Sequence, residues 1–128
     1  MIFVDTCVFM YAVGRQHPLR DEARAFFRQA IERERSGLCT SAEVLQELLH
    51  AYLPVERLET LDAAVMLAEA CIEEVWPVEP EDVRLARDLV DRYQSLGARD
   101  LLHLASCRRR GVADIKTFDR ALAAAFSR

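Results

Sequence analysis

Four acidic side chains stand where a charge is either costly or unusually useful. Asp5 directly follows the apolar residues 2–4, and Asp119 directly follows a second candidate strand near the carboxyl end of the chain. Asp100 and Glu47 fall within candidate helices. Carboxylate oxygens are the ligands that hard divalent cations prefer. If the fold brings these acids together, they would form a site for Mg²⁺ or Mn²⁺.

Each acid also has a purely structural explanation, which the sequence leaves open. Asp5 or Asp119 could cap a helix or a turn, because an Asp side chain readily accepts hydrogen bonds from free backbone N–H groups. Asp100 lies in the first turn of a candidate helix, where the helix dipole favours an acid. Glu47, on the flank of an apolar stripe, could be an exposed salt-bridge partner. Capping and metal binding are compatible, and the four acids together favour the metal site.

The elements that must position these acids alternate between strands and helices. A buried strand begins at Ile2 in an apolar run that reaches about Met10 and is interrupted by a turn at Asp5-Thr6. Further strands are predicted at 38–40, 75–78 and 112–117, and helices at 18–36, 41–53, 58–72, 80–96, 98–110 and 119–126. Parallel strands need crossover connections. The pattern therefore predicts an α/β fold, a three-layer α/β/α sandwich with a short, mainly parallel sheet, in one domain over 1–128.

Such a sheet gathers the carboxyl ends of its strands at one edge, and ligands of open α/β sheets bind at that edge. Asp5 and Asp119 both follow a predicted strand. The topology therefore predicts that they lie near each other, although they are far apart along the chain.

Composition narrows the class of protein. The chain has 128 residues, 52% of them hydrophobic, which is enough to bury a core and argues against disorder. No apolar run approaches the ~18–20 residues of a membrane span, and no secretion signal is apparent, so we expect a cytoplasmic protein without a membrane partner. The four cysteines, Cys7, Cys39, Cys71 and Cys107, form no C-x-x-C pair and are expected to be free thiols.

The net charge of −4 argues against a protein that coats nucleic acid by charge alone. It does not argue against an enzyme whose site is a group of carboxylates neutralised by bound metal. Four such carboxylates would equal the whole net charge.

Four short segments, in order along the chain, resemble the motifs of PIN-domain nucleases. Residues 4–11, VDTCVFMY, resemble the opening strand that ends in Asp and enters a turn. Residues 41–48 resemble the second motif, a helix that carries an inward Glu, here Glu47. Residues 98–105, ARDLLHLA, resemble the third motif, and Thr117-Phe118-Asp119 is similar to the closing T-x-D motif. The match covers the whole chain, and its small size points to the VapC-type toxins within the family.

The resemblance implies a ribonuclease that hydrolyses RNA phosphodiester bonds with one or two Mg²⁺ or Mn²⁺ ions per site. Asp5 and Asp100 would be direct metal ligands. Glu47 and Asp119 would bind a second ion or hold ordered waters. All four would be catalytic residues.

Thr6 and Thr117 would orient these groups from the layer behind them. Two residues depart from the family pattern. Cys7 stands where many members carry Asn or Ser, and Lys116 replaces the usual apolar residue before the threonine. The first could change a hydrogen bond behind the site, and the second could disturb the end of the strand. Neither removes a carboxylate.

Basic side chains near the acids are candidates for contacts with RNA phosphates. Arg99 adjoins Asp100, Arg120 adjoins Asp119, and Arg15 lies in the first connection. The run 108–110 of three arginines ends a helix, where the dipole favours cations, so a structural cap is the preferred interpretation.

Two residues with rings, His103 and Tyr11, lie near the acids along the sequence. His103 lies one turn after Asp100 on a Leu-rich face, and we expect a packed, hydrogen-bonded histidine rather than a general base. Tyr11 could stack on a base.

The resemblance also implies partners: an RNA substrate, a VapB-like antitoxin whose tail lies across the site, and a second copy of the chain in a homodimer. The many apolar positions in the first helices could leave a patch for such a partner.

Other interpretations stay open at this point. The chain could be an inactive PIN scaffold that binds RNA or protein, or a PIN nuclease of RNA processing unrelated to toxicity, and cleavage of DNA at the same site is a further possibility. A phosphoacceptor receiver domain is more distant, because Asp5 has no acidic neighbour and the segment Cys39-Thr40 offers no acceptor Asp.

Overall fold

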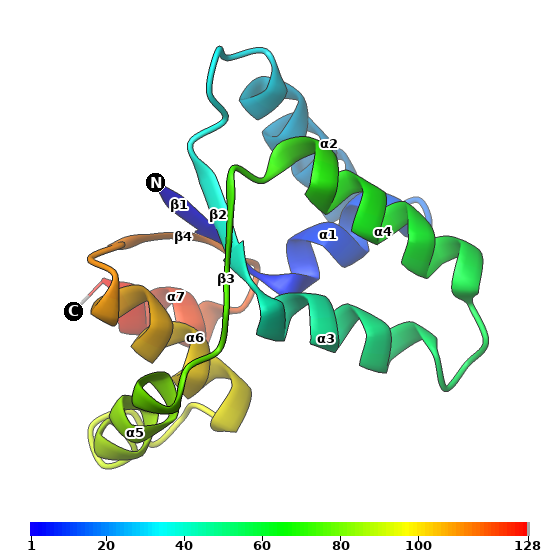
Figure 1. The fold of residues 1–128 in the computed structure, drawn as a ribbon. Coiled ribbons are helices and arrows are strands. Elements are labelled where there is room, and N and C mark those ends of the chain that lie inside the picture. Colours follow the sequence, from blue (N-terminus) through cyan, green and yellow to red (C-terminus); the bar gives the residue numbers. More distant parts are fainter. Residues whose placement is uncertain (128) are drawn as a thin grey trace.

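A short sheet of parallel strands lies at the centre of the computed structural model, which describes residues 1–127 (Figure 1). The strands are β1 (Ile2–Val4), β2 (Leu38–Ser41), β3 (Glu74–Trp76) and β4 (Asp114–Lys116), in the spatial order β3-β2-β1-β4. All neighbouring strands in the sheet are parallel. The predicted fold class, an α/β sandwich with a short parallel sheet, is confirmed.

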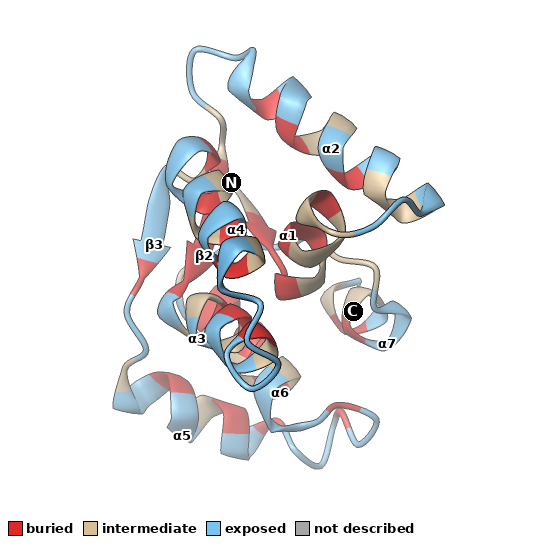
Figure 2. Ribbon diagram, turned by 90° about the vertical axis from the view of Figure 1, so that its right-hand side faces the viewer, coloured by how far each residue is buried: buried red, intermediate tan, exposed pale blue. Residues whose placement is uncertain are grey.

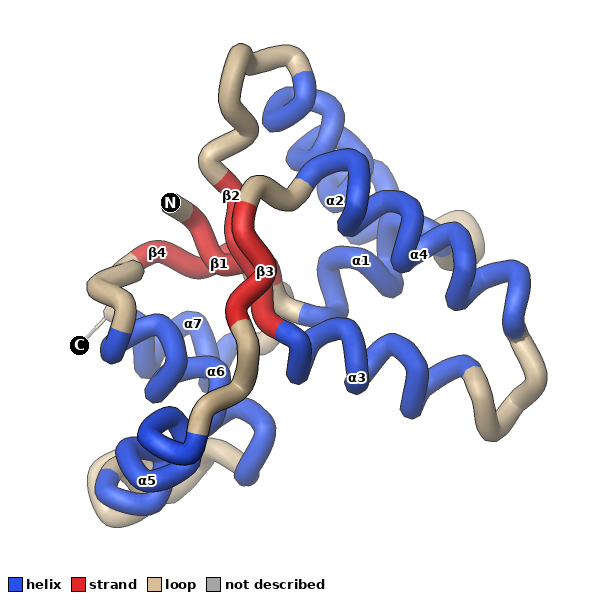
Figure 3. The backbone as a smooth tube through the Cα atoms, in the orientation of Figure 1, coloured by secondary structure: helices blue, strands red, loops and turns tan. Residues whose placement is uncertain are grey.

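Helices cover both faces of this sheet, as parallel strands require (Figure 3). One group consists of α1 (Thr6–Val13), α2 (Pro18–Ile31), α3 (Ala42–Tyr52) and α4 (Leu58–Cys71). The other group consists of α5 (Pro80–Asp88), α6 (Ala98–Arg109) and α7 (Arg120–Phe126). Each group has its own buried cluster of side chains. The first is built on the sheet and α1–α4, and the second lies between α5, α6 and α7.

Strand β1 is a central strand of the sheet, and its residues Phe3 and Val4 are fully buried. Figure 2 shows the buried residues of the chain in red. Val4 aligns with Lys116 of β4, and Phe3 aligns with Cys39 of β2. The hydroxyl of Thr40 donates to the carbonyl oxygen of Val4 over 2.9 Å. The end of β1, which leads into Asp5, is therefore fixed from both neighbouring strands.

The first apolar run differs from its prediction. Residues 8–10 were expected to continue the buried run, yet β1 ends at Val4 and these residues belong to α1. The reason lies in Asp5, whose carboxylate accepts a hydrogen bond from the backbone N–H of Thr6 and so starts a helix there. An apolar run that is buried in either state does not reveal its periodicity.

The other boundaries follow the predictions with two main exceptions. Helix α2 ends at Ile31 rather than near residue 36, and α5 ends at Asp88 rather than near residue 96. Beyond each end the chain forms turns. Ser41 caps α3 as predicted, because its hydroxyl oxygen accepts a hydrogen bond from the backbone N–H of Val44. Helix α6 ends just before Gly111, whose φ of 70° is a conformation that favours glycine.

Two further expectations concern the whole chain. Cys7, Cys39, Cys71 and Cys107 are all free thiols, as predicted. Across residues 1–127, no helix combines the length and the apolar character that crossing a membrane would require.

The arginine run at the end of α6 joins this helix to α5. Asp82 on α5 is fully buried, and its carboxylate accepts from Arg109 over 2.6 Å and from Arg110 over 2.9 Å. Arg110 also lies over the ring of Trp76, 5.0 Å from its centre. The prediction of a solvated structural cap is correct in part: Arg110 donates to the carbonyl oxygen of Ser106 at the helix end over 3.1 Å. The run is not simply solvated, because it also forms ion pairs with the buried Asp82 of α5.

Burial opposes the ionisation of Asp82, but hydrogen bonds from Arg110, from the Glu79 backbone and from Arg109 outweigh it and lower the pKa of Asp82. We predict that Asp82→Ala destabilises the protein by about 3 kcal/mol, because it leaves two arginines beside an empty buried position. Urea unfolding followed by circular dichroism measures this. The matched control is Glu81→Ala, which removes an exposed acid from the same turn and should change the unfolding free energy by less than ~0.5 kcal/mol. Equal effects of the two substitutions would contradict the prediction.

Candidate active site

All four predicted acids line one cavity. It has a volume of about 400 Å³ and lies where β1, β2 and β4 end. Its walls include Asp5 after β1, Glu47 on α3, Asp100 on α6 and Asp119 before α7. We call it the acidic cavity. The structure therefore brings together the four acids that the sequence singled out.

Asp5 forms the floor of the acidic cavity and is held on both oxygens. Its Oδ1 accepts from the backbone N–H of Thr6 over 2.8 Å, and its Oδ2 accepts from the hydroxyl of Thr117 over 2.6 Å. The thiol of Cys7 also donates to Oδ2, over 3.4 Å. Only 6% of the residue is exposed. The carboxylate is thus fixed in orientation by Thr117, the residue after β4, as well as by groups of α1.

Glu47 lies against a histidine. Its Oε1 is 2.8 Å from Nε2 of His103, and its Oε2 accepts a short hydrogen bond from the hydroxyl of Thr6. The imidazole N–H is not aimed at Oε1, so the contact is an ion pair rather than a well-directed hydrogen bond. Burial alone would raise the pKa of Glu47, but His103, Thr6 and Arg99 outweigh it, so that pKa lies below its ordinary value.

His103 is buried, as predicted, with 1% of its surface exposed. Burial alone would lower its pKa, but Glu47, Asp5 and Asp100 together raise it above its ordinary value. Its Nδ1 has no hydrogen-bond partner within residues 1–127. The three acids therefore favour the protonated, positively charged form of this histidine.

Asp100 is the acid of the cavity whose pKa is raised. Burial raises its pKa first, and repulsion from Asp119, Asp5 and Glu47 adds to this, while His103 acts in the opposite sense. The resulting pKa is about 6. Close carboxylates that cannot all ionise freely are the electrostatic setting in which a bound cation is favourable.

Asp119 is the most exposed of the four acids. Its Oδ1 accepts from the backbone N–H of Leu122 over 3.0 Å and so caps α7. Its own N–H donates to the hydroxyl of Thr117 over 3.0 Å. Asp119 therefore caps a helix, as predicted, and also lines the acidic cavity. Asp5 does both as well.

The donor set fits a hard divalent cation. Carboxylate oxygens of Asp5 and Glu47 lie within 4.8 Å of each other beside His103, which supports Glu47 from behind, and the carboxylates of Asp100 and Asp119 line the same cavity. The raised pKa of Asp100 and the imperfect partner of Glu47 Oε1 both indicate negative charge that the protein alone does not fully neutralise.

The predicted RNA contacts are dispersed. Arg99 lines the acidic cavity, and Arg15 lines a neighbouring cavity. Arg120 is exposed and lines neither of them.

Sequence reasoning underestimated two histidines. His103 was expected to be a core residue, yet it contacts Glu47 directly. His50, one turn after Glu47 on α3, lines the acidic cavity and was not singled out. The signal for His50 was its spacing of three residues from Glu47 on the same helix, whereas no spacing within α6 indicates the contact of His103 with Glu47.

The two departures from the family pattern leave the site intact. Burial and the charge of Asp5 raise the pKa of the Cys7 thiol to about 11, so the thiol is a neutral neighbour of that carboxylate. Lys116 keeps its place in β4, with its ammonium 3.5 Å from Glu22 and 5.2 Å from the centre of the Phe118 ring. The strand end is not disturbed.

Comparison with known proteins agrees with this geometry. The family model for the PIN domain matches residues 2–126. Ribonuclease VapC23 of Mycobacterium tuberculosis is 61% identical over 126 residues, which cover 98% of each chain. This chain belongs to the PIN-domain family and, within it, to the VapC ribonucleases. Ribonuclease VapC13 of the same organism is 40% identical over 123 residues, which cover 94% of this chain and 91% of that one.

A solved VapC structure confirms the fold. The toxin VapC20 of Mycobacterium tuberculosis, described as cleaving the sarcin-ricin loop, superimposes with a TM-score of 0.80 at 20% identity. The superposition covers 98% of this chain and 95% of that one. PIN-domain nucleases act with divalent metal, and the acidic cavity of this VapC ribonuclease matches that chemistry.

The raised pKa of Asp100 leads to a stability prediction for the metal-free protein. An acid whose pKa rises from 3.8 in the unfolded chain to about 6 in the fold stabilises the fold only while protonated, so stability is lost as the pH rises through that window. We predict that Asp100→Asn stabilises the protein in EDTA at pH 7.5. The gain is about 1 kcal/mol, discounted for solvent screening because the side chain is half-buried.

Thermal unfolding at several pH values measures this gain, which should vanish below about pH 4 because Asp100 is then protonated in both states. The exposed Asp91→Asn serves as control and should give no gain at either pH. Destabilisation of Asp100→Asn at pH 7.5 would contradict the repulsion among the acids.

Proposed function

We propose that this VapC ribonuclease hydrolyses RNA phosphodiester bonds in the acidic cavity with Mg²⁺ or Mn²⁺, using one or two ions. The observation that carries the proposal is the convergence of Asp5, Glu47, Asp100 and Asp119 on one cavity at the carboxyl edge of the sheet. Both cations accept several oxygen ligands from carboxylates and water.

The roles of the residues follow from their contacts. Asp5 and Asp100 act as direct metal ligands, because hydrogen bonds fix the Asp5 carboxylate and because burial and the neighbouring acids raise the pKa of Asp100, a cost that a bound cation would relieve. Glu47 and Asp119 hold a second ion or ordered waters. When bound, the cation makes water a better nucleophile at neutral pH, polarises the phosphoryl group and offsets the charge on the departing oxygen.

The surrounding side chains hold the acids in place. Thr117 fixes one oxygen of Asp5, and Thr6 fixes one oxygen of Glu47. His103 keeps Glu47 ionised and in place from below. Arg99 stands at the wall beside Asp100, where its charge can meet a phosphate of the substrate.

Substitution of the acids tests this proposal. Asp5→Asn and Asp100→Asn should each lower RNA cleavage by at least ~10³-fold, because a neutral amide neither balances the cation nor replaces a charged ligand. The assay uses purified protein with labelled RNA in Mg²⁺ or Mn²⁺, and EDTA should abolish wild-type cleavage until metal is restored.

Asp91→Asn, an exposed acid in the α5–α6 connection, should cut at the wild-type rate. Circular dichroism verifies that each variant folds. Cleavage by Asp5→Asn at the wild-type rate, or cleavage that persists in EDTA, would overturn the proposal. A wild-type chain that binds RNA and never cuts it would instead be an inactive scaffold.

Membership of the VapC ribonucleases supports a proposal for the biological role. The chain acts in the cytoplasm as the toxin of a toxin–antitoxin pair and is inhibited by a VapB-like antitoxin. The genome sequence beside the gene tests this role. A short reading frame for such an antitoxin would support it, whereas the absence of one would favour an RNA-processing nuclease.

We also propose that the protein is a homodimer that pairs through α3 and α4. Large apolar side chains are exposed there: Leu49 at 45%, Leu53 at 53%, Leu58 at 51% and Met66 at 66%. Leu49 and Met66 border a groove of about 440 Å³ between the two helices. In a two-fold dimer each exposed side chain could be covered by the same surface of the second copy.

We predict that Leu49→Glu converts the dimer into a monomer, because a charge would be buried in an apolar contact. Light scattering after size exclusion measures the mass. Val83→Glu, an equally exposed apolar position on α5, should leave the dimer intact. A monomeric wild-type protein, or a dimeric Leu49→Glu variant, would contradict the proposed interface.

A further inference from the structure

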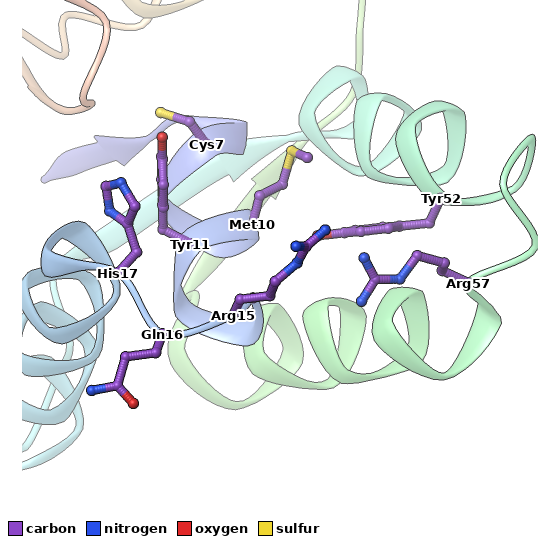
Figure 4. A pocket seen from close by; sticks show the side chains of 9 residues that line it. Cys7, Met10, Tyr11, Arg15, Gln16, His17, Tyr52 and Arg57 are labelled. Atoms are coloured by element: carbon purple, nitrogen blue, oxygen red, sulfur yellow. The ribbon is translucent and has the colours of Figure 1, made fainter.

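A second cavity opens beside the acidic cavity and shares the wall residues Cys7, Met10 and Tyr11 with it. Its volume is about 680 Å³, within the range of ~300–1,000 Å³ that ligand pockets occupy. The remaining walls come from the connection between α1 and α2 and from the end of α3 with the turn before α4. We call it the arginine pocket, after Arg15 and Arg57 (Figure 4).

The two arginines reach the same part of this pocket from different segments of the chain. Arg15 extends from the connection after α1, and Arg57 extends from the residue before α4, and both lie beside Tyr52 (Figure 4). Among residues 1–127, neither guanidinium has an ion pair or a side-chain hydrogen bond to a carboxylate. Two neighbouring cations without a counter-charge favour an anion, and a guanidinium fork matches a phosphate.

The segment that carries Arg15 is anchored rather than loose. Arg24 on α2 donates to the carbonyl oxygen of Ala12 over 2.8 Å, and Arg20 donates to that of Gly14 over 3.3 Å. These contacts join α2 to the last turn of α1 and the residue after it. The backbone that leads into Arg15 is therefore fixed, and its exposed side chain extends into the pocket from an anchored segment.

Aromatic rings form the side of the pocket nearest the acids. The ring of Tyr11 lies 5.2 Å from that of His17 and meets Phe118 edge-on at 5.5 Å. His17 is itself fixed, because its Nδ1 accepts from the backbone N–H of Leu19 over 3.1 Å. Rings held in this way offer a stacking surface for a nucleobase with little loss of conformational freedom on binding.

These features match one ligand class. A single strand of RNA carries a phosphate and a flat base at every step, and proteins that bind such strands combine cations with aromatic rings. Because Tyr11 borders both cavities, a strand with one phosphodiester at the acids would place its next nucleotide in the arginine pocket.

We propose that the arginine pocket binds the nucleotide adjacent to the cleaved phosphodiester of single-stranded RNA. Arg15 and Arg57 pair with its phosphate, and Tyr11 with His17 stacks on its base. This inference rests on the proposed ribonuclease function, because it takes the acidic cavity as the place of cleavage.

The test compares Arg15→Gln, Arg57→Gln and the double variant with wild type. Binding of short, labelled single-stranded RNA is measured by fluorescence anisotropy in EDTA, and cleavage is measured separately with metal. Each single variant should weaken binding roughly tenfold. The slope of log Kd against log salt should fall by about 0.7 for each arginine removed. In cleavage, KM should rise while kcat changes by less than about twofold.

Two controls make the result specific. Arg84→Gln removes an exposed arginine from α5 and should bind RNA like wild type. Tyr11→Leu should weaken binding, whereas Tyr11→Phe should retain it, because Phe keeps the ring. If Tyr11→Leu fails to fold, the arginine variants decide the question alone.

The outcomes separate this inference from the proposed function. Wild type that cuts RNA while the double variant binds and cuts equally well would overturn the arginine pocket and leave the ribonuclease intact. RNA binding that depends on both arginines, without cleavage by wild type, would overturn the function and leave the pocket. A double variant that binds RNA normally but loses affinity for an antitoxin would show a protein-binding pocket, which also overturns the inference.

Discussion

Repulsion between carboxylates is the constraint on which the rest of this structure depends. The parallel sheet brings the ends of β1, β2 and β4 to one edge, and each of these strands delivers an acid or the helix that carries one. Burial and, after it, the charges of the neighbouring acids raise the pKa of Asp100, which is the electrostatic cost of that arrangement. The fold tolerates this cost because the two neighbouring strands fix β1, and because separate buried clusters on the two faces of the sheet stabilise the domain independently of the site. A cation would relieve the repulsion, so binding and the release of strain are coupled.

The contacts that hold the acids are also the contacts that build the helices. Asp5 caps α1 and Asp119 caps α7, so a structural and a chemical role coexist in the same carboxylate. This dual use has a physical reason. A helix N-terminus presents free N–H groups that stabilise negative charge and fix its direction, while a second face of the carboxylate remains open to the cavity. The capping explanation and the metal explanation, which compete when the sequence is read alone, describe two sides of one side chain.

The sequence predicted the parallel fold through its alternation of strands and helices. The same topology placed Asp5 and Asp119 at one edge of the sheet, and the resemblance to PIN-domain motifs added Glu47 and Asp100 to them. The sequence did not predict that Val8 and Phe9 belong to a helix, because an apolar run that is buried in any state has no visible periodicity. It placed His103 in the core correctly but missed its ion pair with Glu47, since contact between two helices depends on how they pack and not on spacing within either one. The sequence did not predict the arginine pocket either, because its walls come from segments that are distant along the chain and meet only in the packed fold. Arg15 was noticed only for its charge, and Arg57 carries no local signal at all.

The net charge of −4 takes on a different meaning once charge is located in space. The four acids of the cavity carry as many negative charges as the net charge of the whole chain. A bound cation would neutralise part of them. Beside that cavity, two arginines without carboxylate partners supply positive charge where a polyanion would continue past the acids. An acidic protein can therefore present an attractive surface to RNA over a short path while repelling it elsewhere. Because screening limits such forces to about 8–10 Å in physiological salt, the local arrangement rather than the total charge decides where a strand lies. That division of charge favours a short stretch of single strand at the site over extended contact with a duplex.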